Sequence, residues 1–290
     1  MTTLWCLGNL TVDEAVRDGV SDGFAMGGDA AFAALAARLE LDDVHMLAPV
    51  GDDLPDAVVA ELRDAGVRIG DLPHRSVGTI RNRIDYAADG ARVWTMLTPE
   101  EDFETLSVQP DDVPAEALAA DGIVLLAMTL EAQLRLTPWL RERSAATLYL
   151  DLQEDYLDAR DELLALIASC DVFLPSEVEA IALAGTTDLV RAAETFRDAG
   201  ARTVVIKRAE QGCLVLDGDR LVEVPADVVE PVDSTGAGDA FCGAFAAAHL
   251  LTGDAVIAAY AGAAAAREAV LGPGIRGILR AARARTGVGR

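Results

Sequence analysis

Short β-branched or leucine-rich runs alternate along this chain with longer alanine-rich segments of helical periodicity. This alternation is typical of βαβ units. The sequence therefore predicts an α/β fold with a mainly parallel central sheet flanked by helices. Strands are expected at residues 3–7, 44–50, 122–126, 147–151, 172–174, 203–207 and 213–216, and helices at residues 29–39, 54–65, 161–169, 177–184 and 189–199.

Two segments interrupt this alternation. Residues 13–23 are short and polar, whereas residues 76–97 alternate as a strand, turn at Asp89 and Gly90, and alternate again. Together they predict a small β-element that stands apart from the main sheet.

The last part of the chain has a different character. From Gly236 onward it is almost wholly helical and rich in alanine, with breaks at Gly253 and at residues 272–274. Because the chain has no repeat, linker or low-complexity stretch, residues 1–290 are predicted to form a single domain with a β appendage.

The chain is strongly acidic, since 48 Asp and Glu residues against 24 Lys and Arg residues give a formal net charge of −24. Such a charge repels phosphate backbones and anionic lipid headgroups, and no run of clustered Lys and Arg compensates for it. We therefore expect no nucleic-acid partner and no membrane partner. The longest apolar stretches also fall short of the ~18 residues that span a bilayer.

The cysteines point to a reducing compartment. They lie far apart and form no CxxC pair, so neither a zinc knuckle nor a disulfide scaffold is supported. Reduced thiols fit a cytoplasmic protein, and the N-terminus has no basic region of the kind that precedes an export signal. The four residues are Cys6, Cys170, Cys213 and Cys242.

The heptapeptide Asp-Ser-Thr-Gly-Ala-Gly-Asp at residues 233–239 stands directly before the helical pattern of residues 240–251. Its small residues let a ligand approach the backbone, and the first NH groups of the helix lack intrahelical partners and lie at the positive end of its dipole. These features predict an anion-binding site. The alternative is that Ser234 or Thr235 only caps the helix.

Asp239 favours the functional interpretation of this segment. It is a carboxylate in the first helical turn, where the dipole favours the ionised form, and it can accept a proton from a hydroxyl that attacks a phosphoryl group. The phosphate loop GxxxxGK[ST] is absent, because the only lysine, Lys207, follows Ile206. A dinucleotide-binding fingerprint is also poor, since Phe241 stands where a third Gly or Ala would fall.

Residues 233–239 resemble the DTxGAGD signature of the ribokinase-like (PfkB) carbohydrate kinases. Weaker features of that family follow one another in the expected order over nearly the whole chain. They lie at residues 8–13, at Gly27 and Gly28 with the helix up to Leu39, and at residues 50–53, 62–67, 175–179 and 205–212.

The resemblance implies a ribokinase-like fold and assigns catalytic roles. Asp239 would be the catalytic base, and the NH groups of Gly236, Ala237 and Gly238 would stabilise the charge on the transferring γ-phosphoryl group. ATP and Mg²⁺ would be the cofactors, with Glu179 helping to hold the hydrated Mg²⁺. The residues implied in nucleotide binding are Lys207, Gly212, Thr235, Gly236 and Gly238.

The resemblance also implies a cation site and an acceptor site. Asp233 and the backbone around Thr235 would face a monovalent cation such as K⁺, while Asp13 would bind acceptor hydroxyls and Gly28 would let the substrate approach the chain. The alternatives are that Asp13 is a turn aspartate and that Glu179 is an exposed helix glutamate. In the family, the segments at about residues 11–23 and 76–97 form a β-lid over the sugar, which often serves dimerisation.

Three residues depart from the family pattern. Phe32 replaces the Asn of GGxxxN, so the substrate contacts change and become more apolar. Ser176 replaces the Asn of NxxE, and Ala209 replaces a common Gly near the nucleotide. Arg81 and Arg83 would share one strand face, either to meet an anionic substrate or, as we prefer, as a solvated lid face.

The function implied by the resemblance is ATP-dependent transfer of a phosphoryl group to a hydroxymethyl group of a sugar or related polyol. A nucleoside kinase is an alternative, because Phe32 could stack on a base. A sugar-binding relative without turnover and a Rossmann oxidoreductase are further alternatives. The expected partner is a small-molecule substrate, with a homodimer formed through the β-lid.

Overall fold

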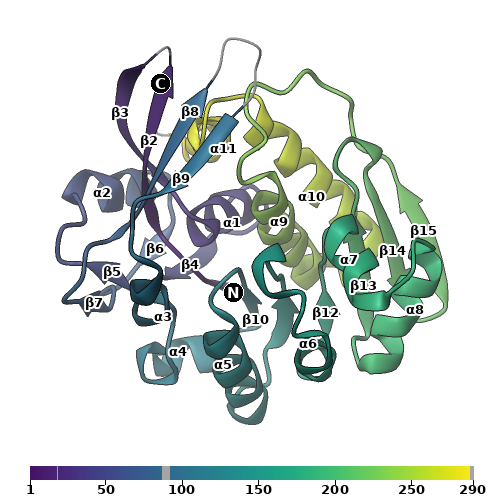
Figure 1. The fold of residues 1–290 in the computed structure, drawn as a ribbon. Helices are drawn as coiled ribbons and strands as arrows, with labels where there is room; N and C mark the ends of the chain where they lie inside the picture. Colours follow the sequence, from purple (N-terminus) through teal and green to yellow (C-terminus); the bar gives the residue numbers. More distant parts are fainter. Residues whose placement is uncertain (18, 87–91, 288–290) are drawn as a thin grey trace.

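A nine-stranded sheet runs through the middle of the computed structural model, which describes residues 1–17, 19–86 and 92–287 (Figure 1). Seven neighbouring strands run parallel, and the last two, β14 and β15, are antiparallel. The predicted mainly parallel sheet is confirmed. In spatial order the strands are β15 (Arg220–Val224), β14 (Cys213–Asp217), β13 (Thr203–Lys207), β12 (Val172–Phe173), β11 (Thr147–Leu150), β10 (Gly122–Leu125), β1 (Thr3–Leu7), β4 (Asp43–Leu47) and β6 (Arg68–Ile69).

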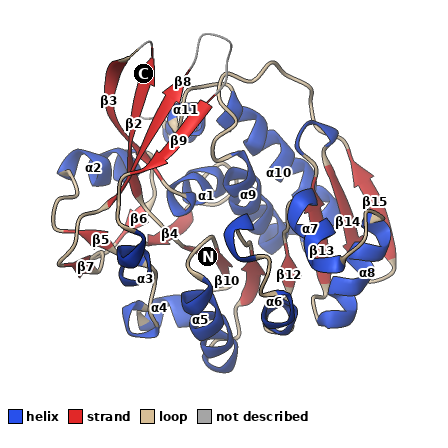
Figure 2. Cartoon of the chain, viewed as in Figure 1, coloured by secondary structure: helices blue, strands red, loops and turns tan. Residues whose placement is uncertain are grey.

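Helices cover both faces of this sheet (Figure 2). The apolar residues of the central strands face one or the other helix layer, so β10, for example, is buried at all four residues. One layer holds α1 (Asp29–Ala37), α2 (Asp56–Asp64), α9 (Ala237–Thr252), α10 (Ala255–Val270) and α11 (Arg276–Thr286). The other holds α4 (Ala115–Leu118), α5 (Leu130–Arg143), α6 (Arg160–Ile167), α7 (Glu177–Ala184) and α8 (Leu189–Ala199). Helix α3 (Phe103–Leu106) and the 3-10 turns Glu100–Asp102, Pro110–Asp112, Glu154–Tyr156 and Ala209–Gln211 lie in connections.

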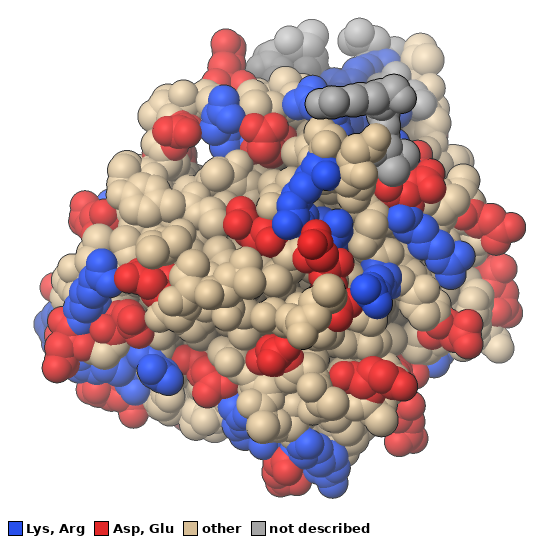
Figure 3. Space-filling view, turned by 180° about the vertical axis from the view of Figure 1, so that it is seen from behind, with Lys and Arg blue, Asp and Glu red and all other residues tan. Residues whose placement is uncertain are grey.

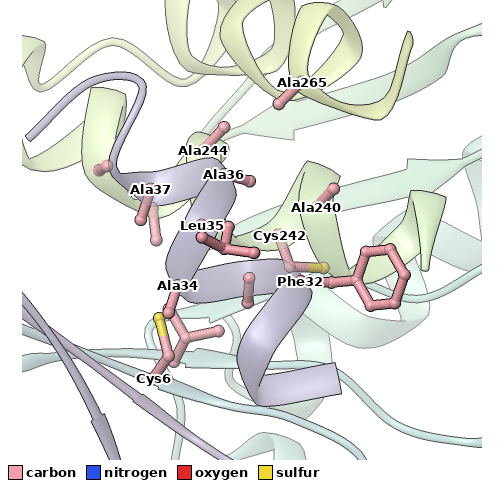
Figure 4. Close-up of a cluster of buried hydrophobic side chains, with 14 of the residues drawn as sticks. Cys6, Phe32, Ala34, Leu35, Ala36, Ala37, Ala240, Cys242, Ala244 and Ala265 are labelled. Carbon is pink, nitrogen blue, oxygen red and sulfur yellow. The ribbon is translucent and has the colours of Figure 1, made fainter. Parts of the chain in front are cut away.

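Helices α1 and α9 pack unusually closely in the first layer (Figure 4). Eight of the nine α1 residues are buried, mostly alanines, so this helix lies inside the protein. A Cβ added to Gly243 of α9 would come within 1.9 Å of the Ala33 carbonyl oxygen of α1. Only glycine permits this approach, and the two helices therefore touch backbone to backbone.

A separate four-stranded sheet stands beside the main body at one end (Figure 1). Its order is β3 (Val20–Gly27), β2 (Thr11–Arg17), β8 (Ile80–Tyr86) and β9 (Arg92–Met96), with β2 and β8 parallel. This is the predicted β-element, which we call the lid sheet. The expected turn at Asp89 and Gly90 lies outside the described residues.

Several boundaries differ from the sequence expectation. The strand expected at 44–50 ends at Leu47, because Pro49 has no NH group to continue the ladder. Val50 and Gly51 form β5 (Val50–Gly51) instead, in a two-stranded sheet with β7 (His74–Arg75). Helix α2 begins at Asp56, after Pro55 in the N-cap position. The expected breaks near Gly253 and residues 272–274 separate α9, α10 and α11.

The surface reflects the acidic composition. Acidic and basic side chains are interspersed over the face seen in Figure 3. No helix among the described residues is long and apolar enough to cross a bilayer.

Candidate active site

The carboxyl ends of the parallel strands form one edge of the sheet, and the candidate site lies there. Asn9 follows β1, Asp151 follows β11, and Lys207 ends β13. The N-terminus of α9, with Gly236 in the N-cap position, faces the same edge. In open α/β sheets this edge is where ligands bind, so the position of the signature is that of a binding site.

Gly236 gives the start of α9 its shape. It adopts a left-handed conformation with φ of 73°, which a residue with a side chain rarely adopts. A Cβ at this position would also come within 2.3 Å of the Phe32 ring. The N-cap residue therefore carries no side chain, so neither Ser234 nor Thr235 occupies the capping position proposed as the alternative. The backbone at the positive end of α9 suits an anion.

Asp239 lies in the first turn of α9; part of the residue is exposed, but the surrounding protein desolvates its carboxyl group. Burial of the carboxyl raises its pKa to about 7; the nearby Asp151 and Glu179 carboxylates also raise the pKa, whereas Lys207 lowers it. We expected the helix dipole to favour the ionised form, but desolvation outweighs it. A carboxylate with a pKa near neutrality is well suited to accept a proton at physiological pH.

A buried ion pair lies under this helix start. The Lys207 ammonium donates to Asp151 Oδ1 at 2.7 Å, and the Cys242 thiol lies 3.3 Å from both Asp151 Oδ2 and Lys207 Nζ. Burial alone would lower the pKa of Lys207, but Asp151, Cys242 and Glu179 together raise it, so the lysine is charged. Lys207 Nζ lies 3.6 Å from where a Gly238 Cβ would stand, which places its charge next to the anion site.

Glu179 is 4% exposed, which excludes the exposed helix glutamate considered as the alternative. It forms a capping box with Ser176: Ser176 NH donates to Glu179 Oε2 at 2.6 Å, and Glu179 NH donates to Ser176 Oγ at 3.2 Å. Burial and the Asp151 carboxylate raise the pKa of Glu179. The serine that replaces the family asparagine thus starts α7 and fixes the glutamate.

Asp233 joins the loop before α9 to the loop before α11. Its Oδ1 accepts from Thr235 NH at 3.0 Å, and its Oδ2 accepts from Gly274 NH at 2.9 Å. The side chain is 3% exposed. In the described part of the chain, no group of three or more His, Cys, Asp or Glu side chains converges as a metal site.

The lid sheet contributes a pocket of about 340 Å³, which we call the acceptor pocket. Asp13, Phe32 and Thr235 all line it, so it connects the lid to the start of α9. Asn82 Nδ2 donates to Asp13 Oδ1 at 2.9 Å. Burial raises the pKa of Asp13, whereas the Asn82 hydrogen bond lowers it. The Asp13 side chain is therefore fixed in the pocket by the Asn82 hydrogen bond, which does not fit the alternative of a turn aspartate.

The two neighbouring glycines have different surroundings. A Cβ on Gly27 would come within 1.9 Å of Asp13 Oδ2, and Gly27 lines the acceptor pocket. Gly28 has φ of 99°, and its Cβ would come within 2.4 Å of the Asn9 carbonyl oxygen. Gly28 thus lies against the loop after β1, whereas Gly27 lines the acceptor pocket; the expected substrate approach at Gly28 stays a prediction.

The turn after Lys207 contains Ala209 and Gly212, which the family resemblance places near the nucleotide. Ala209, which replaces the common glycine, has φ of 48° and is the one non-glycine residue with positive φ in the described ranges. Gly212 has φ of 83°, and a Cβ there would come within 2.0 Å of the Val224 carbonyl oxygen. The positive φ at position 209 explains the common glycine there, and the conformation and close contact at position 212 require the glycine that this chain has.

The contacts of Arg81 and Arg83 do not favour the alternative in which they meet an anionic substrate. Arg81 Nη2 lies 2.8 Å from Asp53 Oδ2, and Arg83 Nη2 lies 2.8 Å from Asp85 Oδ1. Neither arginine lines the acceptor pocket. Both charges are thus neutralised within the protein, in agreement with the preferred interpretation of a solvated lid face.

Sequence reasoning missed Asp151, Asn82 and Asp29. Asp29 accepts from Asn9 NH at 2.8 Å and from Asn9 Nδ2 at 3.2 Å, which fastens the loop after β1 to the start of α1. Burial and the Asp239 charge raise the pKa of Asp29. A signal existed for Asp151, since it is a carboxylate at the end of a predicted parallel strand. For Asn82, only the pairing of β2 with β8 brings it to Asp13.

Residues 7–281 match the family model described as pfkB family carbohydrate kinase. The cytidine kinase of Thermococcus kodakarensis is 31% identical over 257 residues, which cover 86% of this chain and 89% of that protein. The deoxyribokinase of Salmonella typhi is 29% identical over 238 residues, or 79% of this chain and 76% of that protein. An E. coli protein assigned as a ribokinase II, solved with ATP and Mg²⁺, superposes with a TM-score of 0.82 at 21% identity over 99% of both chains. The predicted ribokinase-like fold and the family resemblance are confirmed.

Proposed function

The chain belongs to the pfkB family of carbohydrate kinases, and on that basis we propose that it phosphorylates a hydroxymethyl group of a sugar or related polyol. The similarity to the deoxyribokinase of Salmonella typhi favours a pentose-type sugar. Members of this family are phosphotransferases that use an alcohol acceptor, and the family uses ATP with Mg²⁺. The observation that carries the proposal is that the acceptor pocket adjoins the anion site at the start of α9. Thr235 and Phe32 line the pocket, and the Phe32 ring contacts Gly236 of the anion site.

We assign the chemistry to residues at this junction. Asp239 accepts the proton of the attacking hydroxyl, and its pKa of about 7 suits this role. The backbone NH groups at Gly236, Ala237 and Gly238 stabilise negative charge on the transferring group, and the buried Lys207 charge adds to that field. When bound, Mg-ATP supplies the phosphoryl group and neutralises part of its charge.

Asp13 and Asn82 orient the acceptor. Their hydrogen bond leaves lone pairs of the Asp13 carboxylate available for sugar hydroxyls. The small pocket and the glycine at position 27 suit a sugar ring that approaches the backbone.

Two carboxylates, Glu179 and Asp233, are suited to help bind cations. Glu179 is a buried carboxylate near the phosphate side, which suits contact with the hydration shell of Mg²⁺, an ion that keeps several waters. We also propose a monovalent-cation site beside Asp233, which ties two backbone loops whose carbonyl groups are suitable ligands for K⁺.

The lid sheet would exclude water from the transferring group and so limit ATP hydrolysis. We propose that residues 1–290 act as one kinase domain and that two copies associate through the β9 edge of the lid sheet, where Val93, Met96 and Leu97 are large exposed apolar side chains. The four described cysteines are free and buried, which supports a cytoplasmic location.

A nucleoside is the second candidate acceptor. The 31% identical cytidine kinase favours it, as do the apolar side chains of Ala25, Met26 and Ile84 in the acceptor pocket. Phe32 is 2% exposed and packs on Gly236, so a base would meet these lid residues rather than stack on the Phe32 ring.

An ADP-release assay with Mg²⁺ tests both candidates. Pentoses, hexoses, sugar acids, polyols and nucleosides are offered in turn, with K⁺ and with a larger monovalent cation in its place. ADP release that depends on a pentose supports the first candidate, and release that depends on a nucleoside supports the second. Background ATP hydrolysis alone, with a folded protein that binds ATP, would contradict both.

A further inference from the structure

A second cavity, of about 800 Å³, is lined by residues of the edge strand β3 of the lid sheet and of helices α2 and α11. Figure 1 shows where these three elements lie. Its volume falls within the range of sites for small organic ligands. It has four residues in common with the acceptor pocket, Ala25, Met26, Ile275 and Arg276, but none of the residues assigned to catalysis lines it. We call it the α2/α11 cavity.

The floor of the α2/α11 cavity is apolar. Val12, Met26 and Ile275 are each 3% exposed or less, and Val58 and Leu279 are also buried. At the rim, Phe24 leaves 58% of its surface exposed. The floor and rim thus offer a surface for an apolar or planar group.

One wall of the cavity is basic. Arg276, Arg280 and Arg283 lie four and three residues apart on α11, which places their side chains on one face of that helix. Glu61 of α2 is the one carboxylate lining this cavity in the described part of the chain.

These three arginines differ from most others in the protein. Many guanidinium groups elsewhere pair with carboxylates, as in Arg141 with Asp171 and Arg220 with Asp254. Within residues 1–17, 19–86 and 92–287, the side chains of Arg276, Arg280 and Arg283 form no ion pair or hydrogen bond. In a chain with a net charge of −24, this is a local concentration of unneutralised positive charge.

We propose that the α2/α11 cavity is a second ligand site, which binds a small organic phosphate. The guanidinium groups would hold the phosphate, because their planar donor pairs match its oxygens, and the apolar part would lie against Met26 and Leu279. The bound molecule would touch both the lid sheet and α11, so its binding would be coupled to the position of the lid.

Calorimetric titration of the full chain with phenyl phosphate tests this site directly, in saturating Mg-ADP so that the nucleotide site is filled. Inorganic phosphate and phenol, which correspond to the charged and the apolar part of phenyl phosphate, are titrated separately. AMP and ribose 5-phosphate are titrated as natural organic phosphates. We expect an organic phosphate to bind more tightly than either half. The double variant Arg280→Gln/Arg283→Gln should weaken this binding about tenfold or more, since two charged hydrogen-bonding groups are lost.

Arg191→Gln is the matched control, because Arg191 is exposed on α8, far from the cavity lining, and should leave binding unchanged. The variant Arg280→Lys/Arg283→Lys keeps the charge and should bind with intermediate affinity, which guards against loss of folding as the cause. Failure of every probe to bind would overturn the proposal, as would binding that the Gln variant leaves unchanged. A shift of the protein from dimer to monomer in the Gln variant, measured by sedimentation without ligand, would also overturn it, because a second copy would then cover the cavity.

Discussion

The Phe32 ring lies directly against the backbone of Gly236, so that a Cβ on the glycine would come within 2.3 Å of the ring. The aromatic residue that replaces the family asparagine therefore packs against the first residue of the α9 N-terminus and stabilises its position. One residue on α1 shapes both the acceptor pocket and the anion site.

Phe32→Ala should impair both stability and turnover. Removing a buried phenylalanine ring typically costs about 3–5 kcal/mol in the free energy of unfolding. The empty space beneath Gly236 should also let the start of α9 move, so single-turnover phosphoryl transfer should slow more than ATP binding weakens. Phe32→Leu fills part of the space and should lie between. Urea unfolding and rapid quench of the three proteins measure both effects, and a Phe32→Ala protein with wild-type single-turnover rates would contradict the supporting role.

Asp239→Asn should abolish most turnover and keep ATP binding. The substitution is nearly isosteric, so the backbone at the start of α9 stays in place while the proton acceptor is lost. Loss of a general base typically costs ~10²–10⁴ in rate. Glu179→Gln is the contrast, since it should weaken Mg-ATP binding more than it slows the chemical step. Pre-steady-state kinetics with ATP titration separates the two, and an Asp239→Asn enzyme with a near-wild-type chemical step would exclude the mechanism.

The raised pKa of Asp239 has a consequence for stability. Its pKa is about 7 in the folded protein against 3.8 as the ordinary value. Between pH 3.8 and pH 7 the folded state therefore binds more protons than the unfolded state. The contribution of Asp239 to the free energy of unfolding is thus fully present below pH 3.8 and is lost as the pH rises through 7. Asp239→Asn should therefore be more stable than wild type at pH 8 and about equally stable at pH 4. Urea unfolding at the two pH values checks this, and an equal difference at both would contradict it.

Lys207→Met should destabilise the protein by about 3–5 kcal/mol, because it leaves the Asp151 carboxylate buried without its ion pair. Lys207 also lowers the pKa of Asp239, so its removal should shift the acid limb of the rate profile to higher pH. The double variant Lys207→Met/Asp151→Asn should recover part of the stability. A double-mutant cycle with no coupling between the two positions would show that the pair is unimportant.

Asn82→Leu should raise the KM for the acceptor about tenfold and leave the KM for ATP unchanged. The asparagine amide is the lid group that holds Asp13 in the pocket, and charged hydrogen bonds of this kind matter on that scale. Asn82→Asp is a second variant, and it should do more harm at high pH because two carboxylates would face each other. Steady-state kinetics with each substrate varied in turn provides the measurement, and an unchanged acceptor KM would remove Asn82 from the site.

Site residues that are contiguous in the chain could be predicted from the sequence. Site residues that only the tertiary structure brings together could not. The segment around Gly236 and Asp239 carries its own geometry, because a glycine-rich turn before a helix creates the anion site locally. Asp151 and Asn82 reach the site only through the order of the strands in the two sheets. The pKa of Asp239 depends on burial and on three charged neighbours from different elements, which no local pattern contains.

The strands themselves could be predicted in part, whereas their order in the sheet could not. Apolar runs predicted the parallel strands, since these are buried on both faces. The edge strand β15 escaped prediction because four of its five residues are not fully buried, so its sequence has no apolar run. The end of β4 at Leu47 depends on Pro49, which interrupts the hydrogen-bond ladder without interrupting the apolar pattern.

The contact between Gly243 and Ala33 limits how this enzyme can change its substrate range. Helix α1 carries Phe32, and α9 carries Asp239, so in the proposed mechanism the spacing of the two helices sets the distance between the acceptor and the proposed general base. No side chain lies between them at the contact to act as an adjustable spacer, because backbone meets backbone. Accommodation of a larger or smaller acceptor must therefore come from the lid sheet and the loop before α11, while the two helices move, if at all, as one rigid body.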